Sequence, residues 1–165
     1  MSDFFTDVPE RIPFGGIDSI EPLSFKVYER DRLVMGKPME DHLRIAVCLW
    51  HSFNWPGSDV FGTGTFDRPW LAAGMEPMGA ARAKVEAAFE FIGKLGAPFF
   101  TFHDRDVAPE GRTFTETRAN LDAMVTEIEG HMARTGARLL WATTQLVHRL
   151  RDEVLPDATR GHDVE

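Results

Sequence analysis

The sequence contains little cysteine and has no long uninterrupted apolar segment. Its 165 residues include one cysteine, Cys48, so no internal disulfide can form. No apolar run approaches the roughly 20 residues that a membrane-spanning helix needs. The segment Met1–Phe5 lacks the basic and long apolar regions of a secretory signal. We therefore expect a cytoplasmic protein in which Cys48 is a buried core thiol rather than a nucleophile.

The chain also lacks an excess of basic residues. It has 18 lysines and arginines against 26 aspartates and glutamates, which gives a formal net charge of −8. Nucleic acids and anionic membranes repel an acidic surface, so we expect neither as a main partner. We find no internal repeat or low-complexity tract. The hydrophobic fraction of 43% argues against disorder, and the length suits one domain with a sizeable core.

Three apolar runs alternate with two amphipathic segments. The runs Arg44–Trp50 and Pro98–His103 are typical of buried strands, and Arg138–Thr143 predicts a third strand. The first predicted helix begins near Pro77 and ends at Gly96, with an apolar stripe of Val85, Ala88, Phe89, Ile92 and Leu95. The second begins at a capping box of Thr113 and Glu116 and ends at Gly136, with a stripe of Leu121, Val125, Ile128 and Met132. This β-α-β-α-β order predicts parallel strands and the α/β class.

The two ends of the chain differ from this pattern. Residues 1–40 are punctuated by prolines and predict an irregular N-terminal arm. Residues 41–146 hold the predicted α/β units, and residues 147–165 form a divergent polar tail. Three strands make a small parallel sheet with two open edges, so we expect residues 41–146 to be the beginning of a larger domain.

The segment Phe99–Asp106 (FFTFHDRD) carries the strongest indication of chemistry. An aromatic strand ends there in His103, which is followed by Asp104 and Asp106. In barrels of parallel strands, catalytic side chains lie at the carboxyl ends of the strands. The spacing of three lets His103 and Asp106 face one pocket, which suits a general acid–base histidine held in one tautomer by a carboxylate.

Other interpretations of this segment were weighed against that one. An isolated histidine at a strand end is more often structural, and aspartates are common in turns and helix caps. The three side chains could also bind a metal ion, but three ligands from one tight turn rarely surround an ion well. We favour Asp106 as the orienting carboxylate and Asp104 as a structural residue. His42 and His51, which flank the first strand, are expected to be structural histidines.

Nine short motifs occur along the chain in a fixed order. They are Gly36–Arg44 (GKPMEDHLR), Trp50–Phe53 (WHSF), Gly57–Gly62 (GSDVFG), Arg68–Trp70 (RPW), Phe89–Phe91 (FEF), Lys94–Gly96 (KLG), Phe102–Asp106 (FHDRD), Ala108–Gly111 (APEG) and Leu139–Trp141 (LLW). In this order they resemble the xylose isomerase family, in its longer class with an N-terminal extension, and the resemblance covers approximately residues 5–146. After Leu139–Trp141 the chain departs from the family, because Ala142–Val147 (ATTQLV) stands where the family commonly has Gly-Thr-Ala-Asn.

The resemblance implies a fold and an activity. Members of the family are usually tetramers of a (β/α)8, or TIM, barrel, so this chain would be the N-terminal part of one, with about three β/α units. They are metal-dependent aldose–ketose isomerases that convert D-xylose to D-xylulose, and they also accept D-glucose. They open the sugar ring and then move a hydride between C1 and C2, while two divalent metals (Mg²⁺, or Mn²⁺ or Co²⁺) polarise the oxygens.

The resemblance also assigns roles to five residues. His103 would contact the ring or anomeric oxygen of the sugar and assist ring opening, and Asp106 would orient the His103 side chain. Trp50 and Trp141 would form apolar walls of the pocket, and Phe61 would reach into the site of a neighbouring subunit. A pocket that excludes water suits a hydride shift, because it suppresses proton exchange.

In this family the metal ligands come from later barrel strands, so the resemblance implies no metal ligand within these 165 residues. We expect a truncated isomerase with little activity of its own. The alternative is an inactive fragment, or a docking partner of full-length isomerase subunits. Another enzyme of the same barrel architecture, such as a metal-dependent nuclease, is disfavoured by the acidic charge and by the motifs.

Overall fold

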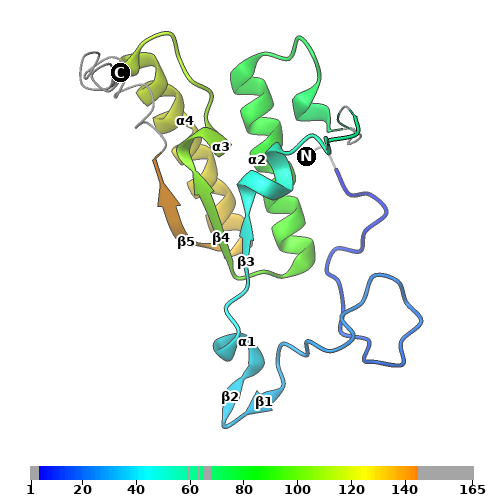
Figure 1. Cartoon of the computed structure of the whole chain (residues 1–165). Coiled ribbons are helices and arrows are strands. Elements are labelled where there is room, and N and C mark those ends of the chain that lie inside the picture. Colours follow the sequence, from blue (N-terminus) through cyan, green and yellow to red (C-terminus); the bar gives the residue numbers. More distant parts are fainter. Residues whose placement is uncertain (1–3, 59, 63, 65–67, 145–165) are drawn as a thin grey trace, which may run out of the picture.

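A three-stranded parallel sheet forms the centre of the computed structural model, which describes residues 4–58, 60–62, 64 and 68–144. The strands are β3 (Ala46–Cys48), β4 (Phe99–His103) and β5 (Arg138–Thr143), in the spatial order β3-β4-β5. Helices α2 (Pro77–Leu95) and α4 (Phe114–Thr135) connect them, and Figure 1 shows the two helices alongside the sheet. The predicted β-α-β-α-β order and the parallel strands are confirmed.

Both long helices begin and end at the residues that the sequence indicated. The Glu76 side chain accepts backbone N–H groups of the first turn of α2, which starts at Pro77. Thr113 caps α4 by accepting the backbone N–H of Glu116 at 3.2 Å. Gly96 and Gly136 end the helices with φ angles of 74°, in the left-handed region that glycine adopts without steric cost.

The core lies between the sheet and the two helices. The Phe89 ring of α2 packs edge-on against the Phe100 ring of β4, with ring centroids 5.0 Å apart, and stacks on His131 of α4 at 4.9 Å. The largest fully buried side chains are Phe89, Phe100, Leu49, Ile92, Met124, Val85 and Val107. Alternate residues of a strand face the same side of a sheet, and in β4 both Phe100 and Phe102 belong to the core.

The first predicted strand is shorter than the apolar run that indicated it. β3 ends at Cys48, and Trp50 begins η1 (Trp50–Asn54), one turn of π-helix. Leu49 is buried although its backbone is helical, at φ −78° and ψ −29°. An apolar run reports burial and not backbone conformation, which is why it overran the strand. Cys48 is only half-buried, so the expectation of a buried thiol was wrong.

One position of the second apolar stripe was also assigned wrongly. Val125 is 39% exposed, whereas its neighbour Met124 is fully buried. The buried side of α4 follows Thr117, Met124 and Ile128, with Leu121 and Met132 packed partly against it. Val125 lies at the edge of this stripe, about 60° around the helix axis from Ile128.

The remaining elements are short. β1 (Leu33–Val34) and β2 (Lys37–Pro38) form an antiparallel pair, followed by α1 (Met39–His42). η2 (Pro69–Leu71) precedes α2, and α3 (Asp104–Val107) follows β4 directly. In the first 40 residues, the backbone N–H groups of Phe4 and Phe5 donate to the Glu90 carboxylate of α2 at 2.8 and 3.1 Å. The division into an arm, a partial barrel and a tail stays a prediction, and the tail of residues 147–165 lies outside the described residues.

Within the described ranges, none of the helices combines the length and the apolarity that crossing a membrane requires.

The packing of Phe89 leads to a prediction about stability. Phe89→Ala removes a buried ring that contacts both Phe100 and His131, and should lower the free energy of unfolding by about 3–5 kcal/mol. Phe114→Ala is the matched control, since its ring is 50% exposed and should cost less than ~1 kcal/mol. Chemical denaturation of the two variants tests this. Equal losses would contradict the placement of the core.

Candidate active site

The carboxyl ends of the three parallel strands meet at one edge of the sheet. β4 ends at His103, which pairs in register with Thr143 at the end of β5. β3 ends nearby and leads into η1, and β4 leads into α3. The residues that follow β3 and β4 are therefore brought to the same edge, where the sequence predicted a site.

His103 and Asp106 form a close pair at this edge. One carboxylate oxygen, Oδ2 of Asp106, lies 3.0 Å from the ring nitrogen Nδ1 of His103 and accepts the backbone N–H of His103 at 2.7 Å. Asp106 is buried, and the His103 side chain is half-buried. The first turn of α3 produces this arrangement, because it places residue 106 back over the residue that precedes the helix.

The pair selects one tautomer of His103. An ionised carboxylate can only accept hydrogen bonds, so Nδ1 must carry the proton that it donates to Asp106. In the neutral imidazole, Nε2 then has an unshared electron pair and can accept a proton. This is the state that a general base requires.

Two tryptophans lie against the His103 ring. The ring centroids of Trp50, in η1, and His103 are 4.7 Å apart. Trp141, in β5, lies 5.4 Å from Trp50 and 5.9 Å from His103. The structure thus brings together four of the five residues that the resemblance singled out. They come from three successive parts of the chain, and their aromatic faces make the surroundings of His103 apolar.

The other residues discussed from the sequence are exposed, bond the backbone, or have side chains outside the described part of the structure. Phe61, in the loop after η1, is 93% exposed. His42 is bonded through Nε2 to the backbone oxygen of Val34 at 2.8 Å, in line with a structural role. The His51 side chain lies outside what the structure describes.

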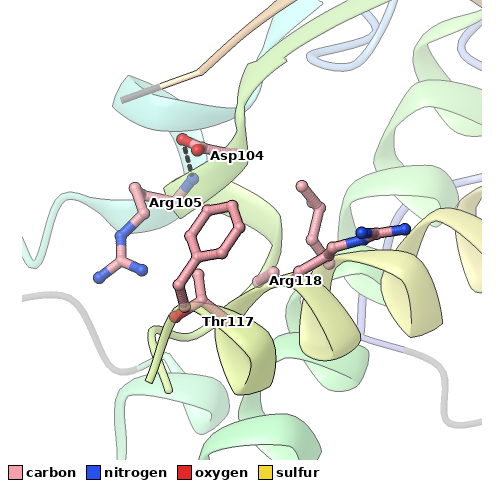
Figure 2. A pocket seen from close by; sticks show the side chains of 7 residues that line it. Asp104, Arg105, Thr117 and Arg118 are labelled. Atoms are coloured by element: carbon pink, nitrogen blue, oxygen red, sulfur yellow. Dashed lines mark hydrogen bonds between the residues drawn. The ribbon is translucent and has the colours of Figure 1, made fainter. Parts of the chain in front are cut away.

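Asp104 adjoins the His103–Asp106 pair in the sequence, but its carboxylate bonds the backbone of α3. Its buried carboxylate accepts the backbone N–H of Arg105 at 2.8 Å, which stabilises the first turn of α3. Asp104 also lines an apolar hollow of about 60 Å³ between α3 and α4, together with Phe114, Thr117 and Arg118 among others. Figure 2 shows the bond between Asp104 and Arg105 beside Thr117 and Arg118. The geometry thus gives Asp104 a local backbone role.

Two residues that the sequence analysis did not single out extend the His103–Asp106 pair. The Asn54 side chain, at the end of η1, donates from Nδ2 to Oδ1 of Asp106 at 2.5 Å. Nζ of Lys84, in α2, donates to Oδ1 of Asn54 at 2.6 Å. Lys84 was detectable in principle, because it occupies the buried side of α2 between Ala81 and Ala88. Asn54 carried no such signal.

Lys84 has a lower pKa than an ordinary lysine. Burial lowers its pKa to about 8, against the opposing effect of the Asp106 charge, which raises it. Burial disfavours the charged form of Lys84, and the nearby Asp106 carboxylate, to which the Asn54 amide connects it, favours that form.

The metal that the resemblance implies finds no ligand set in the part of the chain that the structure describes. Across residues 4–58, 60–62, 64 and 68–144, no three histidine, cysteine, aspartate or glutamate side chains come together as a cation site. Asp106 is already bonded by Asn54 and His103, and Asp104 by Arg105. These residues do not fit a metal ion, and no chemical step is assigned through one.

The parallel three-stranded sheet with its connecting helices places the chain in the α/β class, and comparison with known proteins defines the family. No family model matches the chain. The xylose isomerase of Pseudomonas syringae pv. syringae is 52% identical over 140 residues, which are 85% of this chain and 32% of that protein. Those of Photobacterium profundum and Mesorhizobium japonicum are each 49% identical, over 87% and 91% of this chain and 32% and 34% of the respective proteins.

The chain belongs to the xylose isomerase family, and it spans about a third of the length of these curated relatives. This confirms the resemblance stated from the motifs. Enzymes of this family are isomerases and generally use divalent metals.

The lowered pKa of Lys84 leads to a prediction about alkaline stability. Between pH 8 and the ordinary lysine value of 10.5, the unfolded chain binds a proton at Lys84 that the folded chain has released. The free energy of unfolding should therefore rise with pH across this window, by up to about 3 kcal/mol from this residue. In Lys84→Met that contribution should be absent.

Urea denaturation at a series of pH values measures the effect. Lys94→Met is the control, because Lys94 lies on the same helix but donates to the backbone oxygen of Val8. If the wild type and Lys84→Met have parallel curves between pH 8 and 10.5, Lys84 is not desolvated as described.

Proposed function

We propose that this chain is the sugar-binding and ring-opening portion of a xylose isomerase, acting on D-xylose to give D-xylulose and on D-glucose as a second aldose. The observation that carries the proposal is the His103–Asp106 pair between Trp50 and Trp141, in a chain 52% identical to the Pseudomonas syringae xylose isomerase. The aromatic walls beside the histidine suit a sugar, and the similarity supports the same substrate class.

In this proposal His103 is the catalytic residue for ring opening. A cyclic aldose opens when the anomeric hydroxyl loses its proton, the C1=O bond forms and the bond between C1 and the ring oxygen breaks. The unprotonated Nε2 of His103 accepts the hydroxyl proton, and the imidazolium then returns it to the ring oxygen. Asp106 acts as a positioning residue, because it holds Nδ1 protonated and stabilises the transient imidazolium.

Trp50 and Trp141 would supply the walls. Their rings lie within 6 Å of His103 and offer the apolar faces on which the C–H faces of a sugar can pack. Such walls also exclude water from the reacting carbons, which suits the hydride transfer between C1 and C2 that the family resemblance implies. The described residues account for binding and ring opening alone.

The larger assembly is part of the same proposal. The parallel sheet and its two helices are compatible with the first units of a (β/α)8 barrel, with an N-terminal arm before them. A divalent metal (Mg²⁺, or Mn²⁺ or Co²⁺) would be held by residues outside those described. In a homotetramer, the exposed Phe61 would reach into the site of a neighbouring subunit, and the enzyme would act in the cytoplasm.

The binding step can be tested without turnover. Titrating the full chain with D-xylose should quench tryptophan fluorescence and shift the ring resonances of His103 in an NMR spectrum. His103→Gln should weaken binding about tenfold or more, because a hydrogen bond to a sugar oxygen is worth about 1–1.5 kcal/mol. His42→Gln is the matched control, since His42 bonds only the backbone of Val34. Saturable binding that neither variant weakens would contradict the assignment of His103.

A second candidate function is a non-catalytic one, docking on full-length isomerase subunits. It is favoured by one observation: every residue of β5 is exposed, so one edge of the sheet is uncovered among the described residues. Mixing the chain with the full-length Pseudomonas syringae relative and measuring the mass of the product separates the two functions. A stable mixed oligomer in the absence of D-xylose binding would replace the first proposal with this one.

A further inference from the structure

A line of hydrogen bonds connects the middle of α2 to the catalytic histidine. It runs from Nζ of Lys84 to the Asn54 side chain, then to the Asp106 carboxylate, and from there to the ring of His103. The residues stand far apart in the sequence, in α2, η1 and α3 and at the end of β4. Each link uses a different atom, so the orientation of each group depends on the one before it.

Lys84 and Asp106 together determine which way the Asn54 amide faces. A lysine ammonium group can only donate, so the atom of Asn54 that meets it at 2.6 Å must be the oxygen. The NH2 group of the same amide then faces Asp106, to which it donates at 2.5 Å. The Asp106 carboxylate, which can only accept, selects the NH2 end of the amide, and Lys84 holds the oxygen end, so the two groups fix the orientation of Asn54 from opposite sides.

Asn54 in turn occupies one oxygen of the Asp106 carboxylate and leaves the other to His103. Its Oδ1 accepts from Asn54, and its Oδ2 accepts from the backbone and the ring of His103. With both oxygens bonded to donors, the carboxylate cannot rotate without losing a charge-assisted hydrogen bond. Because an ionised carboxylate only accepts hydrogen bonds, the bond between the His103 ring and Oδ2 requires a proton on Nδ1.

We propose that Lys84 is a positioning residue for His103: acting through Asn54 and Asp106, it keeps the proton of the neutral imidazole on Nδ1 and leaves Nε2 unprotonated to accept a sugar hydroxyl proton. The inference rests on the proposed function, because the unprotonated Nε2 matters only if His103 assists ring opening. The tautomer itself can be measured whether or not the chain binds a sugar. It adds Lys84 and Asn54 to the residues on which ring opening depends, although neither reaches the sugar.

The tautomer of His103 can be measured without sugar or turnover. In the ¹⁵N-labelled full chain at about pH 7.5, where an ordinary imidazole is mostly neutral, the ¹⁵N shifts of His103 should show a large excess of the form protonated on Nδ1. Lys84→Met should lower the ratio of the two tautomers about tenfold, which corresponds to about 1.4 kcal/mol. Lys84→Arg, which retains a donor toward Asn54, should restore much of the ratio.

Two further variants decide between positioning and general support of the fold. Lys94→Met removes a half-buried lysine from the same helix with no connection to Asp106, and should leave the ratio unchanged. Asn54→Ala breaks the line at its second member and should lower the ratio as Lys84→Met does. It also serves if Lys84→Met fails to fold. An unchanged ratio in Lys84→Met or Asn54→Ala, or an equal fall in Lys94→Met, would overturn the inference.

The same spectra separate this inference from the function on which it rests. If D-xylose leaves the His103 resonances of the wild type unmoved, the proposed sugar site fails, while the tautomer ratios of the variants still report on Lys84. If D-xylose shifts them and the ratio in Lys84→Met stays that of the wild type, the site stands and Lys84 has no positioning role.

Discussion

The Asp106 carboxylate is the group on which the arrangement of the site depends. It is buried, it bonds the backbone and the ring of His103 with one oxygen, and it bonds Asn54 with the other. A buried carboxylate is tolerated only when its oxygens are satisfied, so these donors are requirements of folding as well as of chemistry. It selects the tautomer in which the His103 ring donates to it, it holds the NH2 end of the Asn54 amide, and through that amide it faces the half-buried Lys84 cation.

The fold supplies this carboxylate with its donors by simple means. A parallel strand delivers His103 to the sheet edge, and the immediate start of α3 places Asp106 over it. The turn after the neighbouring strand delivers Trp50 and Asn54, and the next strand delivers Trp141. Each of these side chains is carried by a strand or a helical turn, so no long loop is needed to position the site.

Much of this organisation could be predicted from the sequence. Caps, glycine stops and apolar stripes determined α2 and α4 almost to the residue, because they report local backbone chemistry. His103 and Asp106 were found because a strand end and a spacing of three are visible in one segment. Trp50 and Trp141, the proposed pocket walls, could be singled out only from the family motifs, since no local feature of a tryptophan distinguishes a core residue from one that lines a pocket.

What the sequence did not indicate arises from contacts between distant segments. The π-helical turn at Trp50 is indistinguishable from a continued strand in an apolar run, and Val125 differs from Met124 only by the direction in which α4 meets its neighbours. Asn54 and Asp106 are 52 residues apart, and Asn54 and Lys84 are 30 apart. Only the folded chain brings them into one line of bonds.

The most direct test of the account is a crystal structure of the chain with D-xylose. The account predicts the sugar between Trp50 and Trp141, with its anomeric or ring oxygen within hydrogen-bond distance of Nε2 of His103, and Nδ1 still bonded to Asp106. A sugar bound elsewhere, or one that meets His103 through Nδ1 after the Asp106 bond has broken, would contradict it.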